Sequence, residues 1–251
     1  MNANIKEIGH LSFKLKNTEK IRNFYENTLG LNVGFSLKTD KGEERIIYYQ
    51  LHHGHFIEIF PETSVLSWTD YDGHNHDEYY SYQHTTLGEG EGETIQDPEF
   101  NTWKINKGPL YISKVTYNCN DLQKAKTFYR DILEMDIVLD TPDLVYVKVN
   151  EEQVIELRNK PYPKDNCTNN KGQCHFALIV HDIELAAKRL NEKGVQLYHG
   201  PKTSNRPYTG AYEKVAHTEK SYNFYIQDYD DNEIEVMAYS DESFQVKYAL
   251  E

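Results

Sequence analysis

The stretch that decides the fold is GHLSFKLKNTEKIRNFYENTLGLNV, residues 9–33. It recurs in outline as SKVTYNCNDLQKAKTFYRDILEMDIV at 113–138 and as CHFALIVHDIELAAKRLNEKGVQLY at 174–198. Each copy opens with about six residues of alternating polarity, which is the period of a β-strand with one buried face. The chain therefore contains three copies of one unit that begins with a strand.

The second half of each copy predicts a helix. An Asn or Asp stands at the junction, and both are favoured helix N-caps because the side chain accepts from a free backbone N–H. Helix-periodic apolar residues follow, and Gly30 stands where a C-terminal glycine is common. The FY pairs at 24–25 and 128–129 are 104 residues apart, as are His10 and Lys114, so the offset is constant across strand and helix. The expected caps are Asn17, Asp121 and Asp182.

Further strands follow each helix. The last of them read HFIEIF (55–60), QVIELR (153–158) and NEIEVMAY (232–239), and each carries a glutamate near its middle that faces away from the helix-packing side: Glu58, Glu156 and Glu235. The unit is thus a strand, a helix and about three strands, or βαβββ. We expect an α+β fold of repeated βαβββ modules forming curved mixed sheets. The expected organisation is a first module at 1–60, an irregular insert or degenerate module at 61–110, and a paired second and third module at 111–251.

These segments resemble the vicinal-oxygen-chelate superfamily of glyoxalases, bleomycin-resistance proteins and extradiol dioxygenases. The resemblance rests on the IGH opening, the FY helix, the FIEIF ending, the CHFALIVHD strand and the DYDDNEIEVMAY ending, and covers about four-fifths of the chain. It implies that modules pair to form a cup, whose metal ligands come from the first and last strands of each module. The implied cofactor is a divalent ion such as Zn, Ni, Mn or Fe.

Transferred to this chain, the resemblance implies a set of site residues. Metal ligands are expected at His10, Glu58, His84, Glu156, His175 and Glu235, with Glu58 and Glu235 also moving protons. Contacts to the substrate are expected from Lys114, Arg158, Arg206 and Tyr208, the last two in a long loop at 200–221 that could close over a ligand. His84 belongs to SYQHTTLGE (81–89), which is either the start of a degenerate fourth module or a strand completing the first module's sheet. A second chain in a two-fold dimer is the other way to complete the first module.

The second module departs from the pattern, because Lys114 stands where the first histidine would be. An ammonium group is a poor neighbour for a divalent ion. Three explanations remain open: an ion pair of Glu156 with Lys114 or Arg158, a cup that binds an anionic substrate without metal, and an ion site built from Glu156, His175 and Glu235 with the lysine acting on substrate.

Composition narrows the class of protein. The 251 residues carry a formal net charge of −13, which disfavours nucleic acid or an anionic membrane as a partner. Three cysteines without metal-type spacing and the absence of an apolar leader suit a cytoplasmic protein. The HHGH segment at 52–55 predicts the turn of a hairpin, and the histidines at 74 and 76 belong to a polar loop, so we place neither group in the core site.

Three functions fit these observations. The first is a glyoxalase-like or dioxygenase-like metalloenzyme acting on a small substrate with vicinal oxygens. The second is a protein that sequesters a small or antibiotic-like molecule without turnover, and Lys114 with the 20 tyrosines favours it. The third is a structural or regulatory protein whose cups have lost their chemistry.

Overall fold

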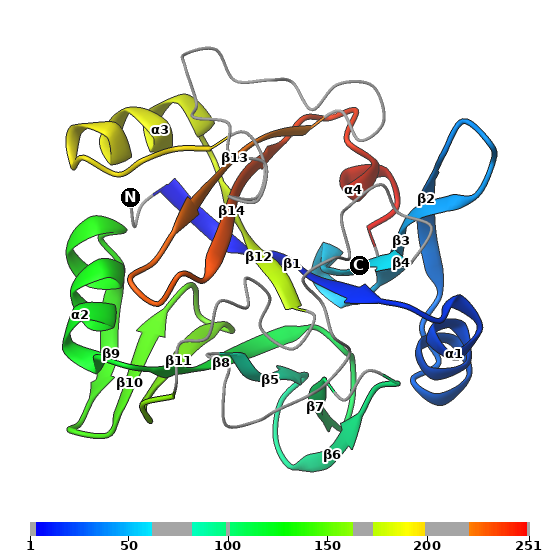
Figure 1. Cartoon of the computed structure of the whole chain (residues 1–251), viewed down its shortest axis with the longest axis horizontal. Coiled ribbons are helices and arrows are strands. Elements are labelled where there is room, and N and C mark those ends of the chain that lie inside the picture. Colours follow the sequence, from blue (N-terminus) through cyan, green and yellow to red (C-terminus); the bar gives the residue numbers. More distant parts are fainter. Residues whose placement is uncertain (1–3, 62–81, 99–100, 163–172, 199–220, 250–251) are drawn as a thin grey trace.

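The structure is a computed structural model, and it describes residues 4–61, 82–98, 101–162, 173–198 and 221–249. Two seven-stranded mixed sheets, here called sheet A and sheet B, contain all the named strands. In Figure 1 sheet A lies above sheet B, and α1, α2 and α3 lie at the periphery. The expected α+β fold of curved mixed sheets is confirmed.

Sheet A combines the first and third sequence copies. Its strands, in spatial order, are β13 (Ser221–Gln227), β14 (Glu233–Tyr239), β12 (Gln173–Val180), β1 (Ile5–Leu15), β4 (Phe56–Pro61), β3 (Glu44–Gln50) and β2 (Val33–Lys38). The two first strands, β1 and β12, run antiparallel at the centre. Each is flanked by the last strand of its own module, β4 or β14, in a parallel pair.

Sheet B combines the second copy with a short fourth unit. Its order is β6 (Gly92–Gln96), β7 (Thr102–Asn106), β5 (Tyr82–Leu87), β8 (Ile112–Cys119), β11 (Val154–Asn159), β10 (Leu144–Lys148) and β9 (Asp136–Asp140). Its centre repeats that of sheet A, since β5 and β8 are antiparallel and each has a parallel neighbour, β7 or β11.

The prediction that the second and third modules pair is therefore wrong. Their first strands, β8 and β12, lie in different sheets. The partner of β12 is β1, at the other end of the sequence, and the partner of β8 is β5, from the short fourth unit. The alternative in which the strand of His84 completes the first module's sheet is also wrong, because β5 belongs to sheet B.

The three predicted helices form where the caps placed them. They are α1 (Thr18–Arg22), α2 (Leu122–Thr127) and α3 (Ile183–Glu192), and the first two widen into π-helical turns at Asn23–Thr28 and Phe128–Ile132. The three cap side chains each accept a backbone N–H of the first turn, from Lys20 at 2.9 Å, Lys124 at 3.0 Å and Leu185 at 2.9 Å. The predicted turn at 52–55 is a short 3-10 turn, His52–Gly54, between β3 and β4. The remaining helix, α4 (Phe244–Lys247), follows β14.

The fourth unit keeps one further mark of the module. The Asp97 carboxylate accepts from the backbone and side-chain amides of Asn101, at 2.9 and 2.8 Å, in the turn before β7. Asp228 and Asn232 make the same two bonds, at 2.9 and 2.8 Å, in the turn before β14. The segment from β5 to β7 is thus a module that has no helix between its described strands.

The two sheets share one buried core, and hydrogen bonds from polar side chains connect them. Tyr25, in the first module's helix, donates to Asp97 of the fourth unit at 2.9 Å. The side chain of Gln153, 1% exposed, accepts from Ile8 N at 2.8 Å and donates to the carbonyls of Ile8 (3.0 Å) and Ile112 (2.8 Å). Gln153 therefore ties β1, which carries His10, to sheet B.

No helix of the described residues is long and apolar enough to cross a membrane. Cys119 is a buried free thiol on β8, and burial, with Asp230 and Asp228 nearby, raises its pKa above the usual range. It is therefore an inert core residue rather than a reactive one.

Candidate metal centre

The register of four strands at the centre of sheet A assembles the site. His10 on β1 lies opposite Ala177 on β12, and Ser12 lies opposite His175. The parallel neighbours place Glu58 beside Ser12 and Glu235 beside Ala177. All four candidate ligands therefore share one face of the sheet, although 225 residues separate the first from the last.

A close approach of β1 and β12 is part of this assembly. Gly9 precedes His10, and a Cβ built on it would lie 2.5 Å from the Ile179 side chain and 2.7 Å from the Tyr239 hydroxyl. No other residue fits without displacing them, which gives the IGH opening a physical reason.

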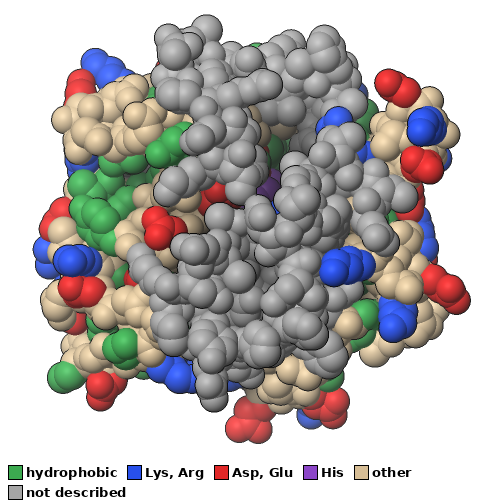
Figure 2. Space-filling model, in the orientation of Figure 1, with side chains coloured by type: hydrophobic (Ala, Val, Ile, Leu, Met, Phe, Trp, Pro, Cys, Tyr) green, Lys and Arg blue, Asp and Glu red, His purple; other side chains and the backbone are tan. Residues whose placement is uncertain are grey.

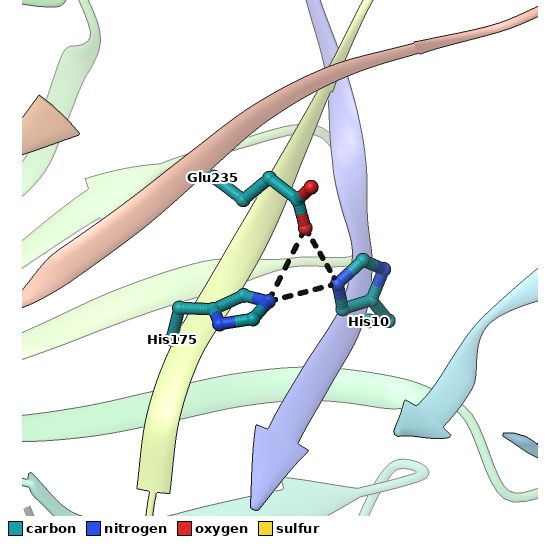
Figure 3. A group of neighbouring side chains, drawn as sticks. All are labelled: His10, His175 and Glu235. Atoms are coloured by element: carbon teal, nitrogen blue, oxygen red, sulfur yellow. Dashed lines mark hydrogen bonds and ion pairs between the residues drawn. The ribbon is translucent and has the colours of Figure 1, made fainter. Parts of the chain in front are cut away.

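Three of the four side chains converge in Figure 3. His10 Nε2 is 3.0 Å and His175 Nε2 is 3.2 Å from Glu235 Oε2, and the two Nε2 atoms are 3.4 Å apart. Glu58 Oε2 closes the group, at 3.6 Å from His10 Nε2 and 3.3 Å from His175 Nε2. The four residues are between 1% and 4% exposed. In the space-filling view, acidic side chains and a histidine are visible near the middle of the face, whereas the other charged side chains lie mostly around the rim (Figure 2).

A second group of polar side chains holds the carboxylates. Ser12 donates to Glu58 and is also 2.8 Å from His175 Nε2, while Tyr48 donates to the other oxygen of Glu58 at 2.5 Å. Asn223 on β13 donates to Glu235. The residues that orient the site were not predicted from sequence. Ser12 could have been found, because alternation places it on the same face of β1 as His10. Asn223 lies on β13, the strand next to that of Glu235.

The contacts between carboxylates and imidazoles shift the pKa values of the site residues. Burial disfavours a charge on His175, but the carboxylates of Glu235 and Glu58 outweigh it and raise the pKa of His175 to about 10. Burial also opposes ionisation of Glu235, yet its contacts with both histidines hold its pKa well below the usual range. The pKa of Glu58 is lowered in the same way, against burial and the nearby Glu235. The raised pKa of His175 means that its protonated imidazole supplies positive charge beside the two carboxylates when no ion is bound.

This donor set fits a divalent ion. His10, His175 and Glu235 offer ligand atoms that all lie within 4.8 Å of one another, and Glu58 adds a second carboxylate beside them. Two imidazoles and two carboxylates suit Zn, Ni, Mn or Fe rather than Ca or Mg, which prefer oxygen alone. Both Nδ1 atoms are buried without a hydrogen-bond partner among the described residues, so each ring turns its Nε2 toward the site.

The other predicted site residues lie elsewhere. His84, Lys114, Glu156 and Arg158 belong to sheet B, so His84 does not join His10 and Glu58, and the alternative site combining Glu156 with His175 and Glu235 is wrong. The expected ion pair is confirmed in both forms, because Lys114 Nζ is 2.6 Å and Arg158 Nε 2.5 Å from Glu156. Arg206 and Tyr208 lie outside the described residues, as do the histidines at 74 and 76.

Comparison with known proteins places this geometry in a family. A sequence model of the Glyoxalase/Bleomycin resistance protein/Dioxygenase superfamily matches residues 111–236, just over half of the chain. The chain belongs to this superfamily.

Solved structures agree on the fold. Glyoxalase I from Zea mays is 14% identical with a TM-score of 0.61, over 92% of each chain. A putative dioxygenase from Bacillus subtilis is 14% identical with a TM-score of 0.66, over 99% of this chain and 92% of that one. No curated protein matches the sequence. At these identities the structural likeness establishes the fold and leaves the reaction to be argued from the site.

Proposed function

We propose that the chain is a glyoxalase-like, metal-dependent enzyme that acts on a small substrate with two neighbouring oxygens, by moving a proton rather than by using dioxygen. The observation that carries this proposal is the convergence of His10, His175, Glu235 and Glu58 in one buried group, with every contact to a histidine nitrogen between 3.0 and 3.6 Å. When bound there, a divalent ion would act as a Lewis acid toward adjacent substrate oxygens.

The second carboxylate favours proton transfer. Non-haem oxygenases use two histidines and one carboxylate, which leaves Glu58 without a part in that arrangement. A carboxylate at the edge of such a site is instead suited to take a proton from a carbon next to a carbonyl. Glu58 is the better candidate of the two, because the Ser12 and Tyr48 hydroxyls hold it in place as an acceptor.

Glu235 has a different role in this proposal. It lies between the two imidazoles, at 3.0 and 3.2 Å, and Asn223 fixes its second oxygen. These contacts suit a ligand that stays in place. His10, His175 and Glu235 would therefore hold the ion, and Glu58 would move the proton at the substrate carbon.

A dioxygenase remains a second candidate, because His10, His175 and Glu235 alone have the composition of the facial triad of non-haem Fe(II) oxygenases. Oxygen uptake separates the two functions. The enzyme proposed here consumes no dioxygen with any substrate that it converts, whereas a dioxygenase consumes one molecule per turnover.

The test begins with metal content and carbon-bound protons. Protein purified without a histidine tag should contain about one equivalent of a transition metal, and chelation should remove both metal and activity. Activity is measured with a panel of α-hydroxycarbonyl compounds in D₂O, by NMR detection of proton exchange at the hydroxyl-bearing carbon next to the carbonyl. Tight binding of such compounds that survives chelation, with no exchange, would indicate a sequestering protein instead.

Variants separate the two carboxylates. Glu235→Gln should reduce metal affinity by at least about tenfold, since it removes a charged ligand. Glu58→Gln should retain metal while losing about 10²–10⁴-fold in exchange rate, the usual contribution of a positioned general base. Glu43→Gln, the same change in the exposed turn between β2 and β3, is the control and should alter neither. Equal metal loss in both site variants, with no separate effect on rate, would contradict these roles.

A further inference from the structure

The strand register at the centre of sheet B matches that of sheet A position for position. In sheet A, Ser12 faces His175 across one ladder and Glu58 across the other, and in sheet B, Thr116 faces His84 and Glu156 in the same two ways. The match extends to one hydrogen bond, since Thr116 Oγ1 is 3.1 Å from His84 Nε2. The equivalent pairs are His10 with Lys114, Ser12 with Thr116, Glu58 with Glu156, His175 with His84, Ala177 with Thr86, and Glu235 with Lys104.

Two of the four ligand positions of sheet B are therefore lysines. Lys114 replaces a histidine and Lys104 replaces a glutamate, while His84 and Glu156 are retained. The sequence supports the second replacement independently. IQDPEFNTWKI at 95–105 aligns with IQDYDDNEIEV at 226–236, and places Lys104 against Glu235.

The replacements reverse the charge of the centre. Sheet A presents two carboxylates at these positions, whereas sheet B presents two ammonium groups and one carboxylate, with the Arg158 guanidinium beside them. His84 adds no charge, because burial and then the nearby Lys104 and Arg158 lower its pKa to about 3. Such a centre repels a divalent cation and attracts an anion.

Part of this charge lacks a partner. Lys114 and Arg158 both turn to Glu156, but Lys104 makes no hydrogen bond or ion pair with any described residue. Thr86, which lies between Lys104 and Lys114 across the two ladders, has a buried hydroxyl with no hydrogen-bond partner in the described part of the chain. In sheet A the residues equivalent to the two lysines are His10 and Glu235, and their side chains come within 3.0 Å of each other. Two like charges at such positions call for a shared anion.

An open pocket adjoins one of the two lysines. It has a volume of about 520 Å³, lies on β8, β11 and β10, and is lined among others by Lys114, Tyr146, Glu156 and Arg158, whereas Lys104 and Thr86 are not among its lining residues. Lys114 Nζ lies 5.6 Å from the centre of the Tyr146 ring. Asp143 and Lys160 also line the pocket, and their formal charges are opposite.

We propose that the centre of sheet B is a second, metal-free binding site for the carboxylate or phosphate group of a small molecule, held by Lys104, Lys114 and the Thr86 hydroxyl. Arg158 occupies the position of Phe60 in sheet A, two residues beyond the glutamate, and adds a guanidinium at the rim of the pocket. The site does not depend on the reaction proposed for sheet A.

The first test is binding of inorganic phosphate at constant ionic strength, measured by calorimetry on the full chain after chelation, so that no metal can hold the anion. One phosphate should bind per chain, and Lys104→Gln should weaken it by about tenfold through loss of one charge-assisted hydrogen bond. Lys126→Gln removes the same charge from α2, where the lysine pairs with Asp140, and should change the affinity less than twofold. Absence of saturable binding, or equal affinity in wild type and Lys104→Gln, would overturn the proposal.

The second test converts the site. Lys104→Glu, Lys114→His and Arg158→Phe together give sheet B the four ligand residues of sheet A, with Phe60's equivalent restored beside them. The triple variant should bind one more equivalent of Zn²⁺ than wild type and lose phosphate binding, with an unchanged far-UV circular dichroism spectrum as evidence of folding. A folded variant with the metal content of wild type would overturn the equivalence of the two centres. Because the count is a difference, this result is independent of whether sheet A itself binds metal.

Discussion

Metal binding in sheet A should release protons, because the His175 imidazole is protonated when no ion is bound. A metal ligand must be a neutral imidazole, and the pKa of His175 is raised to about 10 by Glu235 and Glu58 despite its burial. At pH 7.5 the neutral form is then well under 1% of the total, which costs on the order of 3 kcal/mol of apparent binding free energy. Glu58 and Glu235 have lowered pKa values and release nothing at this pH.

The expected result is at least one proton released per metal ion between pH 6.5 and 8.5. The apparent affinity should rise about tenfold per pH unit over this range. Calorimetry with Zn²⁺ in buffers of different ionisation enthalpy measures the proton count directly, and His175→Gln, which removes the titrating group, should lower the count by one. An affinity that is flat with pH, with fewer than half a proton released, would refute the charge balance described for the site.

The raised pKa of His175 also makes the free energy of unfolding of the metal-free protein depend on pH. The folded-state pKa of His175 lies above its ordinary value of 6.5, so protonation favours the folded chain. This contribution is fully present below pH 6.5 and is lost as the pH rises toward 10. The lowered pKa values of the two glutamates act only at acid pH and do not oppose it. Chemical denaturation of chelated protein should therefore show stability falling across this window.

Three further predictions concern the framework of the site. Gly9→Ala should lower the free energy of unfolding by about 1–3 kcal/mol, measured by urea denaturation, because its Cβ would overlap the Ile179 side chain; a neutral result would mean that β1 and β12 can separate without cost. Gln153→Ala should cost about 2–3 kcal/mol by leaving buried backbone groups unpaired, whereas Gln123→Ala on the exposed face of α2 should cost less than about 0.5 kcal/mol. Tyr25→Phe should cost about 1 kcal/mol, through loss of the bond to Asp97 that crosses between the sheets, and an unchanged unfolding midpoint would exclude that bond as a stabilising contact.

The sequence predicts the module well because each of its parts is locally determined. Asn17, Asp121 and Asp182 begin helices through bonds made within three residues, and alternation fixes which face of a strand is buried. Alternation also places His10, Glu58, His175 and Glu235 on the strand faces away from the helices, whereas their choice as ligands came from the family resemblance, and their assembly in one group had no local signal.

The pairing of modules has no comparable local determinant. An antiparallel pair of first strands can form between any two modules, and the closest pair among the three predicted copies, 113–138 and 174–198, is not one that forms. The partner of the second module is the fourth unit, and no helix-cap pattern follows the first strand of that unit. The strand of His84 was therefore left as an isolated motif. Secondary-structure propensity is a property of local sequence, whereas the choice of which modules pair depends on how the whole apolar surface becomes buried.

The segment at 81–89 was expected to be either a degenerate fourth module or a strand of the first module's sheet, and one sequence feature decides for the fourth module and indicates its chemistry. The turn at 97–101 begins with Asp and ends with Asn, and so does the turn at 228–232; in each, the aspartate binds the asparagine's backbone and side-chain amides. Aligning the two turns assigns β7 as the last strand of a module and places Lys104 where the other sheet has Glu235. The same alignment shows why the duplicated centre cannot be a second copy of the first: with a lysine at each of two ligand positions, it has exchanged affinity for a cation for affinity for an anion.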